Sequence, residues 1–185
     1  MNTASNVSTG KPKITGAIWR APKGTALPAS AVDQLNAAFN CVGYIANEGV
    51  VNDNNIETDS YHAWGGDVVI VYQTEKTDTF NWNMIETLNE EVQKAFHGDD
   101  NVSGTLADGM TVRVNANDLD ENVWVIELSL RGAFRRIVIP SGKVSEKGEV
   151  TYQDEDVIKY PITITAQAYE GYDGDTHREY TKKAS

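Results

Sequence analysis

An alternation of apolar and polar side chains between residues 79 and 84 constrains the fold of this chain most strongly. The side chains of one face are Phe80, Trp82 and Met84, and those of the other are Thr79, Asn81 and Asn83. A period of two residues is typical of a β-strand with one buried face. The second face is polar but uncharged, so we expect it to meet water or a polar cavity.

The flanking residues predict a strand before this segment and a helix after it. From residue 66 to 73 the side chains are mostly β-branched or aromatic, as strands prefer. The short polar segment 75–78 has the right length for a hairpin turn between the two strands. The residues Thr87-x-x-Glu90 fit a capping box at a helix start. An amphipathic helix with Gly98 as its C-cap is predicted by a stripe of Leu88, Val92, Ala95 and Phe96.

The same criteria predict further strands along the chain. They cover residues 14–20, 41–46, 110–116, 122–131, 133–140, 144–152, 160–169 and 177–181. Between 122 and 131, apolar residues such as Trp124 and Ile126 alternate with a second face that includes Glu127 and Ser129. About eight strands and one helix predict a mainly β fold. We expect two packed antiparallel sheets, as a sandwich or barrel, with one flanking α-helix and extended arms and loops.

A length of 185 residues fits one domain with arms. We expect a flexible N-terminal arm at 1–13, a β domain at 14–170 and a C-terminal arm at 171–185. Residues 47–62 predict a long polar connection, and loops of this length are usually functional or mobile.

Residues 21–28 contain two prolines and a glycine and fit no regular strand or helix. Trp19 beside them either fills the core of its own chain or anchors this segment on a partner. Both interpretations remain open from the sequence.

The formal net charge of −11 argues against a protein that grips nucleic acid through phosphates, because such proteins need clustered Lys and Arg. The charge is also distributed in blocks. Segments 47–62 and 98–130 are acidic, whereas 11–24 and 131–147 each carry a balance of +4. In a self-associating protein, the basic blocks are candidates to meet acidic blocks of a neighbour. In a monomer, they are solvated surface patches.

No apolar run is long enough for a transmembrane helix, and the polar N-terminus lacks the apolar segment of a signal peptide. The single cysteine, Cys41, lies in an apolar string, which favours a small buried side chain in a protein made in a reducing cytoplasm. The segment 99–104 begins like a calcium loop, but Met110 stands where the bidentate Glu is needed. We find no catalytic or metal motif. We therefore predict no enzyme activity, no cofactor, and no catalytic or metal-binding residue.

Several segments, in order, resemble the major tail tube proteins of long, non-contractile-tailed bacteriophages. They are especially similar to the tube proteins of actinobacterial phages and prophages. The matching segments are 16–28 (GAIWRAPKGTALP), 42–49 (VGYIANEG), 63–69 (AWGGDVV), 79–89 (TFNWNMIETLN), 96–102 (FHGDDNV) and 136–144 (RIVIPSGKV). The order is kept from about residue 14 to about residue 180, nearly the whole chain.

The resemblance implies a virion protein that is assembled in the host cytoplasm. Six copies would form a ring around a channel, and stacked rings would form the tail tube. The implied partners are other copies of the chain, the tape measure protein, and the tail terminator and distal tail proteins. Double-stranded DNA would pass through without specific binding. No membrane insertion is implied.

Within that assembly, the alternation makes one set of residues candidates for the channel lining: Thr79, Asn81, Asn83, Glu127 and Ser129. The irregular and polar segments supply candidates for inter-subunit contacts: Trp19, Pro22, Leu27, Glu48, Asp53, Asn55, Glu57, Tyr61 and Trp64. The alternative function is a monomeric β-sandwich module for binding or adhesion in a phage tail.

Overall fold

A computed structural model describes residues 2–184 of the chain. The strands of this part are β1 (Lys11–Pro12), β2 (Ile18–Pro22), β3 (Asn40–Cys41), β4 (Ile45–His62), β5 (Val68–Met84), β6 (Val102–Ser103), β7 (Thr111–Val112), β8 (Asn122–Leu130), β9 (Ala133–Lys147), β10 (Tyr160–Ala166) and β11 (Arg178–Lys183). The helical elements are α1 (Glu90–His97) and the short 3-10 turns η1 (Ala4–Asn6), η2 (Asp99–Asn101) and η3 (Glu170–Tyr172). The predicted mainly β fold with one flanking helix is confirmed.

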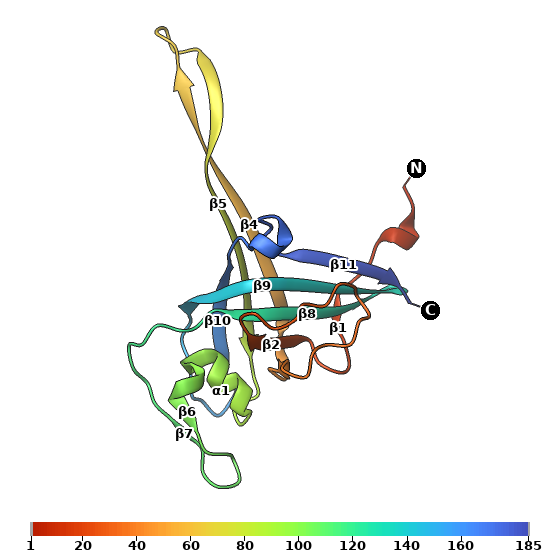
Figure 1. The fold of residues 1–185 in the computed structure, drawn as a ribbon, viewed down its shortest axis with the longest axis vertical. Helices are drawn as coiled ribbons and strands as arrows, with labels where there is room; N and C mark the ends of the chain where they lie inside the picture. Colours follow the sequence, from red (N-terminus) through yellow and green to blue (C-terminus); the bar gives the residue numbers. More distant parts are fainter. Residues whose placement is uncertain (1, 185) are drawn as a thin grey trace.

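Antiparallel pairing joins nine of these strands into one network in the order β3-β2-β8-β9-β10-β5-β4. Strand β1 adds to β8, strand β11 adds to β9, and β6 and β7 form a separate small sheet. Because β9 is long, its first half pairs with β8 and its second half pairs with β10. The network therefore forms two packed leaves that share β9 (Figure 1).

The main core lies between the two leaves. One leaf contributes Ile18, Trp124, Ile126, Ile137 and Ile139, and the other contributes Phe80, Trp82, Met84, Ile162 and Ile164. Helix α1 closes this core with Val92, Ala95 and Phe96. The indoles of Trp82 and Trp124 meet edge-to-face across the leaves at 5.2 Å, a favoured aromatic geometry. A second, smaller cluster covers the outer side of the first leaf with Ala21, Phe39, Val123, Val125, Val138 and Tyr172.

The largest departure from the sequence-based expectation is the hairpin formed by β4 and β5. The predicted turn at 75–78 is wrong, since β5 runs through it without interruption, and the predicted long loop at 47–62 is a strand. The two strands pair from Ile45 to His62, and the real turn lies between them. In that turn Gly65 and Gly66 adopt positive φ angles of 119° and 99°, which residues other than glycine rarely adopt. The hairpin projects far beyond the body (Figure 1).

Polar composition caused this error. Segment 47–62 is rich in Asn and Asp, which strands disfavour, so its sequence alone predicts a loop. Pairing with the Val-rich strand β5 overrides that local preference. Bulges after Glu57 and Tyr61 absorb the irregular register.

Helix α1 begins later than the predicted capping box. Its N-cap is Asn89, whose side-chain oxygen accepts a hydrogen bond from the backbone N–H of Glu91 at 2.9 Å. The backbone carbonyl of Thr87 instead accepts a hydrogen bond from the side-chain amide of Gln93. Leu88 is exposed and leaves the predicted stripe. Gly98 is the C-cap as predicted, with a φ of 99°.

Other predicted boundaries also move. The strands predicted at 133–140 and 144–152 are wrong as separate elements, because one strand, β9, continues to Lys147 and the chain is irregular from 148 to 159. The predicted strand at 110–116 shortens to β7, and the one at 14–20 shifts to β2.

The terminal segments differ from each other. Strand β11 confirms the short strand predicted near 177–181, and it pairs along β9, so most of the segment predicted as a C-terminal arm belongs to the body. Residues 2–10 are exposed, whereas Lys11 and Pro12, part of the predicted flexible arm, pair with β8.

Candidate functional site

The outer face of the second leaf is a polar surface centred on β5, and the β5 side chains on it are uncharged. Thr79, Asn81 and Asn83 are half-buried and alternate with the core residues of that strand. Their neighbours on β10 are Thr165, opposite Thr79, and Thr163, opposite Asn81. The sequence therefore predicted the outward direction of these three side chains correctly, although the structure of one chain does not test which of them line a channel.

Hydrogen bonds tie this surface, which we call the polar face, to the adjacent strands. Thr165 donates to Ser145 Oγ at 2.9 Å, and Ser145 donates to the carbonyl of Thr163 at 3.3 Å. Thr79 donates to the carbonyl of Asp53 on β4 at 3.4 Å. These hydrogen-bonded hydroxyl groups of Thr79, Ser145 and Thr165 expose dipoles to solvent and carry no net charge. Such a surface can be wetted and can slide past a polyanion without holding it.

The structure does not bring Glu127 and Ser129 to the polar face. Strand β8 belongs to the first leaf, and its side chains at 127 and 129 point away from the main core on the opposite outer side of the molecule. Glu127 is only 3% exposed, so the prediction that it faces an open channel is wrong for the described chain. Alternation identified two faces of β8, but it could not show that the polar one is covered.

A buried ion pair explains why Glu127 is there. Arg136, which is 2% exposed, donates to Glu127 Oε1 from Nε at 3.1 Å and from Nη2 at 2.5 Å. Lys13 adds a third contact at 3.1 Å. Arg136 also donates to the carbonyl of Ser30 at 2.8 Å. This network attaches the irregular segment 23–39 and the N-terminal segment to the first leaf, so its role is structural.

The predicted contact residues fall into two groups. Trp19 and Leu27 are half-buried and pack against the second hydrophobic cluster, so their own chain supplies at least part of their partners. Pro22 is exposed at the end of β2, and Glu48 forms a salt bridge with Lys159 at 3.2 Å. The remaining members of the prediction lie exposed on the projecting hairpin, and they are Asp53, Asn55, Glu57, Tyr61 and Trp64.

The outer part of this hairpin, residues 53–77, is named the hairpin arm. Every side chain in it is exposed except those of Ser60 and Thr77, which are half-buried. It also carries a dense set of exposed large apolar side chains: Ile56, Tyr61, Trp64, Val68, Val69, Ile70, Val71 and Tyr72. A two-stranded ribbon is at best marginally stable in water by itself, and exposed apolar patches mark interaction sites. The sequence-based candidates include Tyr61 and Trp64 from this set. They omit Ile56, which was placed in a polar loop, and the residues from Val68 to Tyr72, which were assigned only to a strand.

The base of the hairpin arm is fastened by a buried carboxylate. Asp78, 1% exposed, accepts hydrogen bonds from His177 Nδ1 at 2.6 Å, Thr176 Oγ1 at 2.5 Å and Asn52 Nδ2 at 2.8 Å. Burial raises the pKa of Asp78, but these three bonds outweigh it and hold the pKa below its usual range. The bond to Asp78 raises the pKa of His177, whose ring also meets Phe80 edge-to-face. The C-terminal segment thereby fixes where the hairpin leaves the body.

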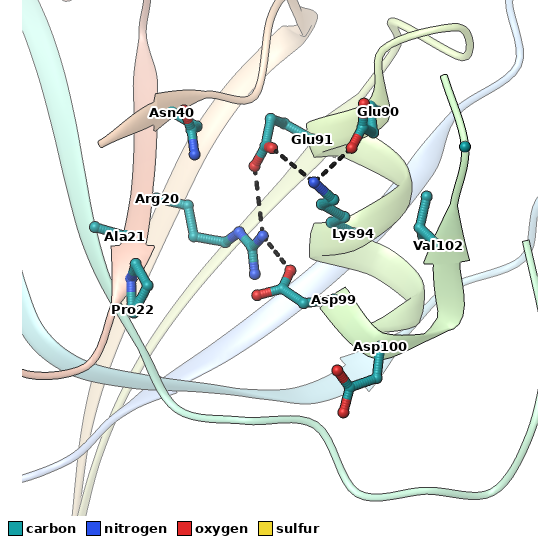
Figure 2. A pocket seen from close by; sticks show the side chains of 11 residues that line it. Arg20, Ala21, Pro22, Asn40, Glu90, Glu91, Lys94, Asp99, Asp100 and Val102 are labelled. Carbon is teal, nitrogen blue, oxygen red and sulfur yellow. Dashed lines mark hydrogen bonds and ion pairs between the residues drawn. The ribbon is translucent and has the colours of Figure 1, made fainter. Parts of the chain in front are cut away.

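A hollow of about 360 Å³ lies between β2 and helix α1, and most of its charged residues are already paired (Figure 2). Arg20, almost fully buried, contacts Glu91 at 3.4 Å and Asp99 at 2.5 Å. Lys94 contacts Glu90 at 2.5 Å. These pairs anchor the helix to the first leaf, and of the charged side chains that line the hollow only Asp100 forms no salt bridge within residues 2–184.

Groups with reactive or metal-binding potential are scattered in the described residues. No cluster of three or more His, Cys, Asp or Glu side chains in residues 2–184 has metal-site geometry. Cys41 is half-buried at the end of β3, and burial raises the pKa of its thiol, which disfavours a reactive thiolate. Within this same part of the chain, no helix has the length and apolar character needed to cross a membrane.

Three solved structures are similar over most of the chain. The anti-feeding prophage cap aligns with a TM-score of 0.44 at 9% identity, covering 98% of each chain. The sheath–tube complex of an extracellular contractile injection system (PVC), in the extended state, aligns with a TM-score of 0.44 at 8% identity, covering 94% of this chain and 93% of the other. The sheath/tube terminator of the same kind of system gives 0.40 at 9% identity, with 93% and 97% covered.

A search of curated protein sequences found no match. The profile of the phage tail tube protein family, in contrast, matches residues 6–177. That range includes both leaves, the polar face, the hairpin arm and helix α1. The chain therefore belongs to the phage tail tube protein family.

Proposed function

We propose that this chain is a structural subunit that assembles into six-membered rings, which stack into a tail tube and conduct DNA at ejection. The observation that carries the proposal is the second leaf. Its inner face is core, the outward β5 side chains Thr79, Asn81 and Asn83 are polar and uncharged, and it ends at a free edge, β4. A leaf of this kind can form one segment of a channel wall.

The two ends of the strand order support ring closure. The network ends at β4 on one side and β3 on the other within the described residues. A free edge exposes unpaired backbone N–H and C=O groups and invites another strand. Joining one copy's edge to a different edge of the next copy is a head-to-tail contact, which closes into a ring when the rotation per copy allows it.

Charge supports a channel for DNA. Six copies at −11 each carry −66. In the proposed ring, Thr79, Asn81 and Asn83 line the channel, and none of these three side chains is a cation that DNA phosphates could bind. The long non-contractile tail, the tape measure protein inside the tube and assembly in the host cytoplasm belong to the same proposal.

Electron microscopy of the purified protein tests assembly directly. We expect rings with six-fold symmetry, or tubes, at high protein concentration. A protein that stays monomeric when tape measure and tail-initiator proteins are supplied would overturn the proposal. It would favour a monomeric binding module instead.

Lysine substitutions test the channel face. Asn81→Lys and Asn83→Lys should preserve rings and sharply reduce infection by phage that carry the variants, because the added cations hold DNA in the channel. Thr151→Lys, at an exposed position outside the strands, is the matched control and should leave infection unchanged. Full infectivity of the Asn81 and Asn83 variants, or loss of folding, would refute the channel assignment.

A further inference from the structure

Unpaired charges of opposite sign gather at two separate places in this chain. The hairpin arm holds five acidic side chains against Lys76 alone, a net charge of −4: Asp53, Glu57, Asp59, Asp67 and Glu75. None of the five forms a salt bridge within the described residues, although the body of the protein is rich in such pairs. Asp53, Glu57 and Asp59 are separated by even numbers of residues on β4, so they lean to one side of the ribbon.

The opposite charge lies around the tight turn between β8 and β9. All sixteen Lys and Arg residues lie in the described part of the chain, and nine of them form salt bridges there. Four of the other seven gather at this turn, and we call them the basic end: Lys11, Arg131, Lys182 and Lys183. Strand register brings them together, because Lys11 is opposite Ser129 and Lys183 is opposite Ala133.

Apolar side chains accompany the charges at both places. The hairpin arm exposes Trp64 and Ile70, among others. Near the basic end, Val7, which precedes the Ser8 side chain bonded to the backbone of Arg131, is 72% exposed, and Ile14, three residues along the chain from Lys11, is fully exposed. In Figure 1 the hairpin arm extends away from the body, while the β8–β9 turn and the C-terminus lie together at another extremity. Among residues 2–184, no salt bridge joins the two.

We propose that the acidic hairpin arm of one copy docks on the basic end of a second copy. This inference rests on the proposed self-assembly and specifies the receiving surface. The contact pairs unsatisfied charges of opposite sign, which orients and accelerates association, and it covers apolar side chains on both partners. It also gives the marginal ribbon the second surface that its own chain does not supply.

Charge reversal with rescue tests the contact. Glu57→Lys with Asp59→Lys should raise the protein concentration needed for assembly by at least about tenfold, and Lys182→Glu with Lys183→Glu should do the same. Combining all four reversals should return that concentration to within about threefold of the wild type, because opposite charges face each other again. Asp154→Lys with Glu155→Lys, at an exposed unpaired acidic turn, is the matched control and should assemble like the wild type.

A cross-linking experiment gives an independent readout. With Cys41→Ser as background, a mixture of Asp59→Cys and Lys183→Cys proteins should form a covalent dimer with a short bis-maleimide. Asp154→Cys in place of Asp59→Cys should not. Thermal unfolding of each variant confirms that folding is intact before assembly is measured.

The outcomes separate the docking proposal from the proposed function. If the wild type assembles but the charge reversals have no effect, the docking proposal is wrong and tube assembly stands. The same holds if the variant with all four substitutions does not regain assembly and no cross-link forms. If the wild type never self-associates under any condition, both are overturned. Binding of a DNA duplex to the basic end, lost in Lys182→Glu with Lys183→Glu while assembly is unchanged, would also overturn the docking proposal.

Discussion

Removing the charge of Asp78 should weaken the fold by several kcal/mol and change its pH dependence. The side chain is 1% exposed and accepts three hydrogen bonds, one of them from His177 at 2.6 Å. Breaking a buried ion pair by removing one partner typically costs about 3–5 kcal/mol. Asp78→Asn keeps the shape and part of the hydrogen bonding, so we expect a loss near the lower end, about 3 kcal/mol. For a domain of this size, that corresponds to a fall of about 6–12 °C in Tm.

The sign of the pH effect follows from the two pKa shifts. The pKa of Asp78 lies below its ordinary value of 3.8, so its contribution is present above that pH and is lost as the carboxylate is protonated in the fold. The pKa of His177 lies above its ordinary value of 6.5, so its contribution is complete below that pH and declines as pH rises through the folded value. Glu179 also raises the pKa of His177, and Lys76 opposes it. The pair therefore stabilises the fold most between about pH 4 and 6.5.

Urea unfolding of the monomer from pH 4 to pH 9 measures both effects. The difference in unfolding free energy between wild type and Asp78→Asn should be largest near pH 5 and should shrink towards pH 9. Asp154→Asn removes an exposed carboxylate and should leave the free energy within about 0.5 kcal/mol of wild type at every pH. An Asp78→Asn protein as stable as wild type, or a difference that is flat from pH 5 to pH 9, would refute the reasoning.

Three further predictions concern the body of the protein, each measured by urea unfolding. Asn89→Ala should cost about 1 kcal/mol through loss of the helix N-cap, whereas Thr87→Ala should cost less than about 0.5; the reverse order would restore the capping box expected from sequence. Trp82→Ala should cost about 3–5 kcal/mol, since it opens a cavity between the two leaves, and a loss below 1 would contradict their packing. Arg136→Ala should cost about 3–5 kcal/mol because it leaves Glu127 buried with Lys13 alone, and Glu127→Gln in the same background should recover part of that loss.

Alternation was sufficient to predict the parts of the fold where one strand face meets the core. Phe80, Trp82 and Met84 are buried as expected, and so are Trp124 and Ile126 on the strand that packs across from them. This succeeds because a shift of one residue would bring all the apolar side chains of a strand into water at once. Helix α1 was found for the same reason, through Val92, Ala95 and Phe96.

The failures occurred where a partner segment, and not local composition, decides the outcome. Glu127 has the pattern of an exposed residue, but Arg136 and the N-terminal segment cover it, and no spacing within β8 reveals that. The Asn-rich and Asp-rich segment 47–62 becomes a strand only because β5 lies beside it. The sequence predicted Asp78 to be a turn residue, but it is buried because Thr176 and His177, almost 100 positions later in the chain, donate hydrogen bonds to it.

The hairpin arm poses a problem that its charges can solve. Exposed β-branched side chains on a free ribbon favour uncontrolled strand pairing, as with Val69, Ile70 and Val71. Acidic residues placed along the same ribbon repel other acidic hairpin arms, so two free subunits do not associate through these ribbons. The same acidic side chains attract a surface of opposite charge. One set of carboxylates can therefore keep free subunits apart and select the basic end as the docking surface, which explains why the acidic side chains of the hairpin arm form no salt bridge among the described residues.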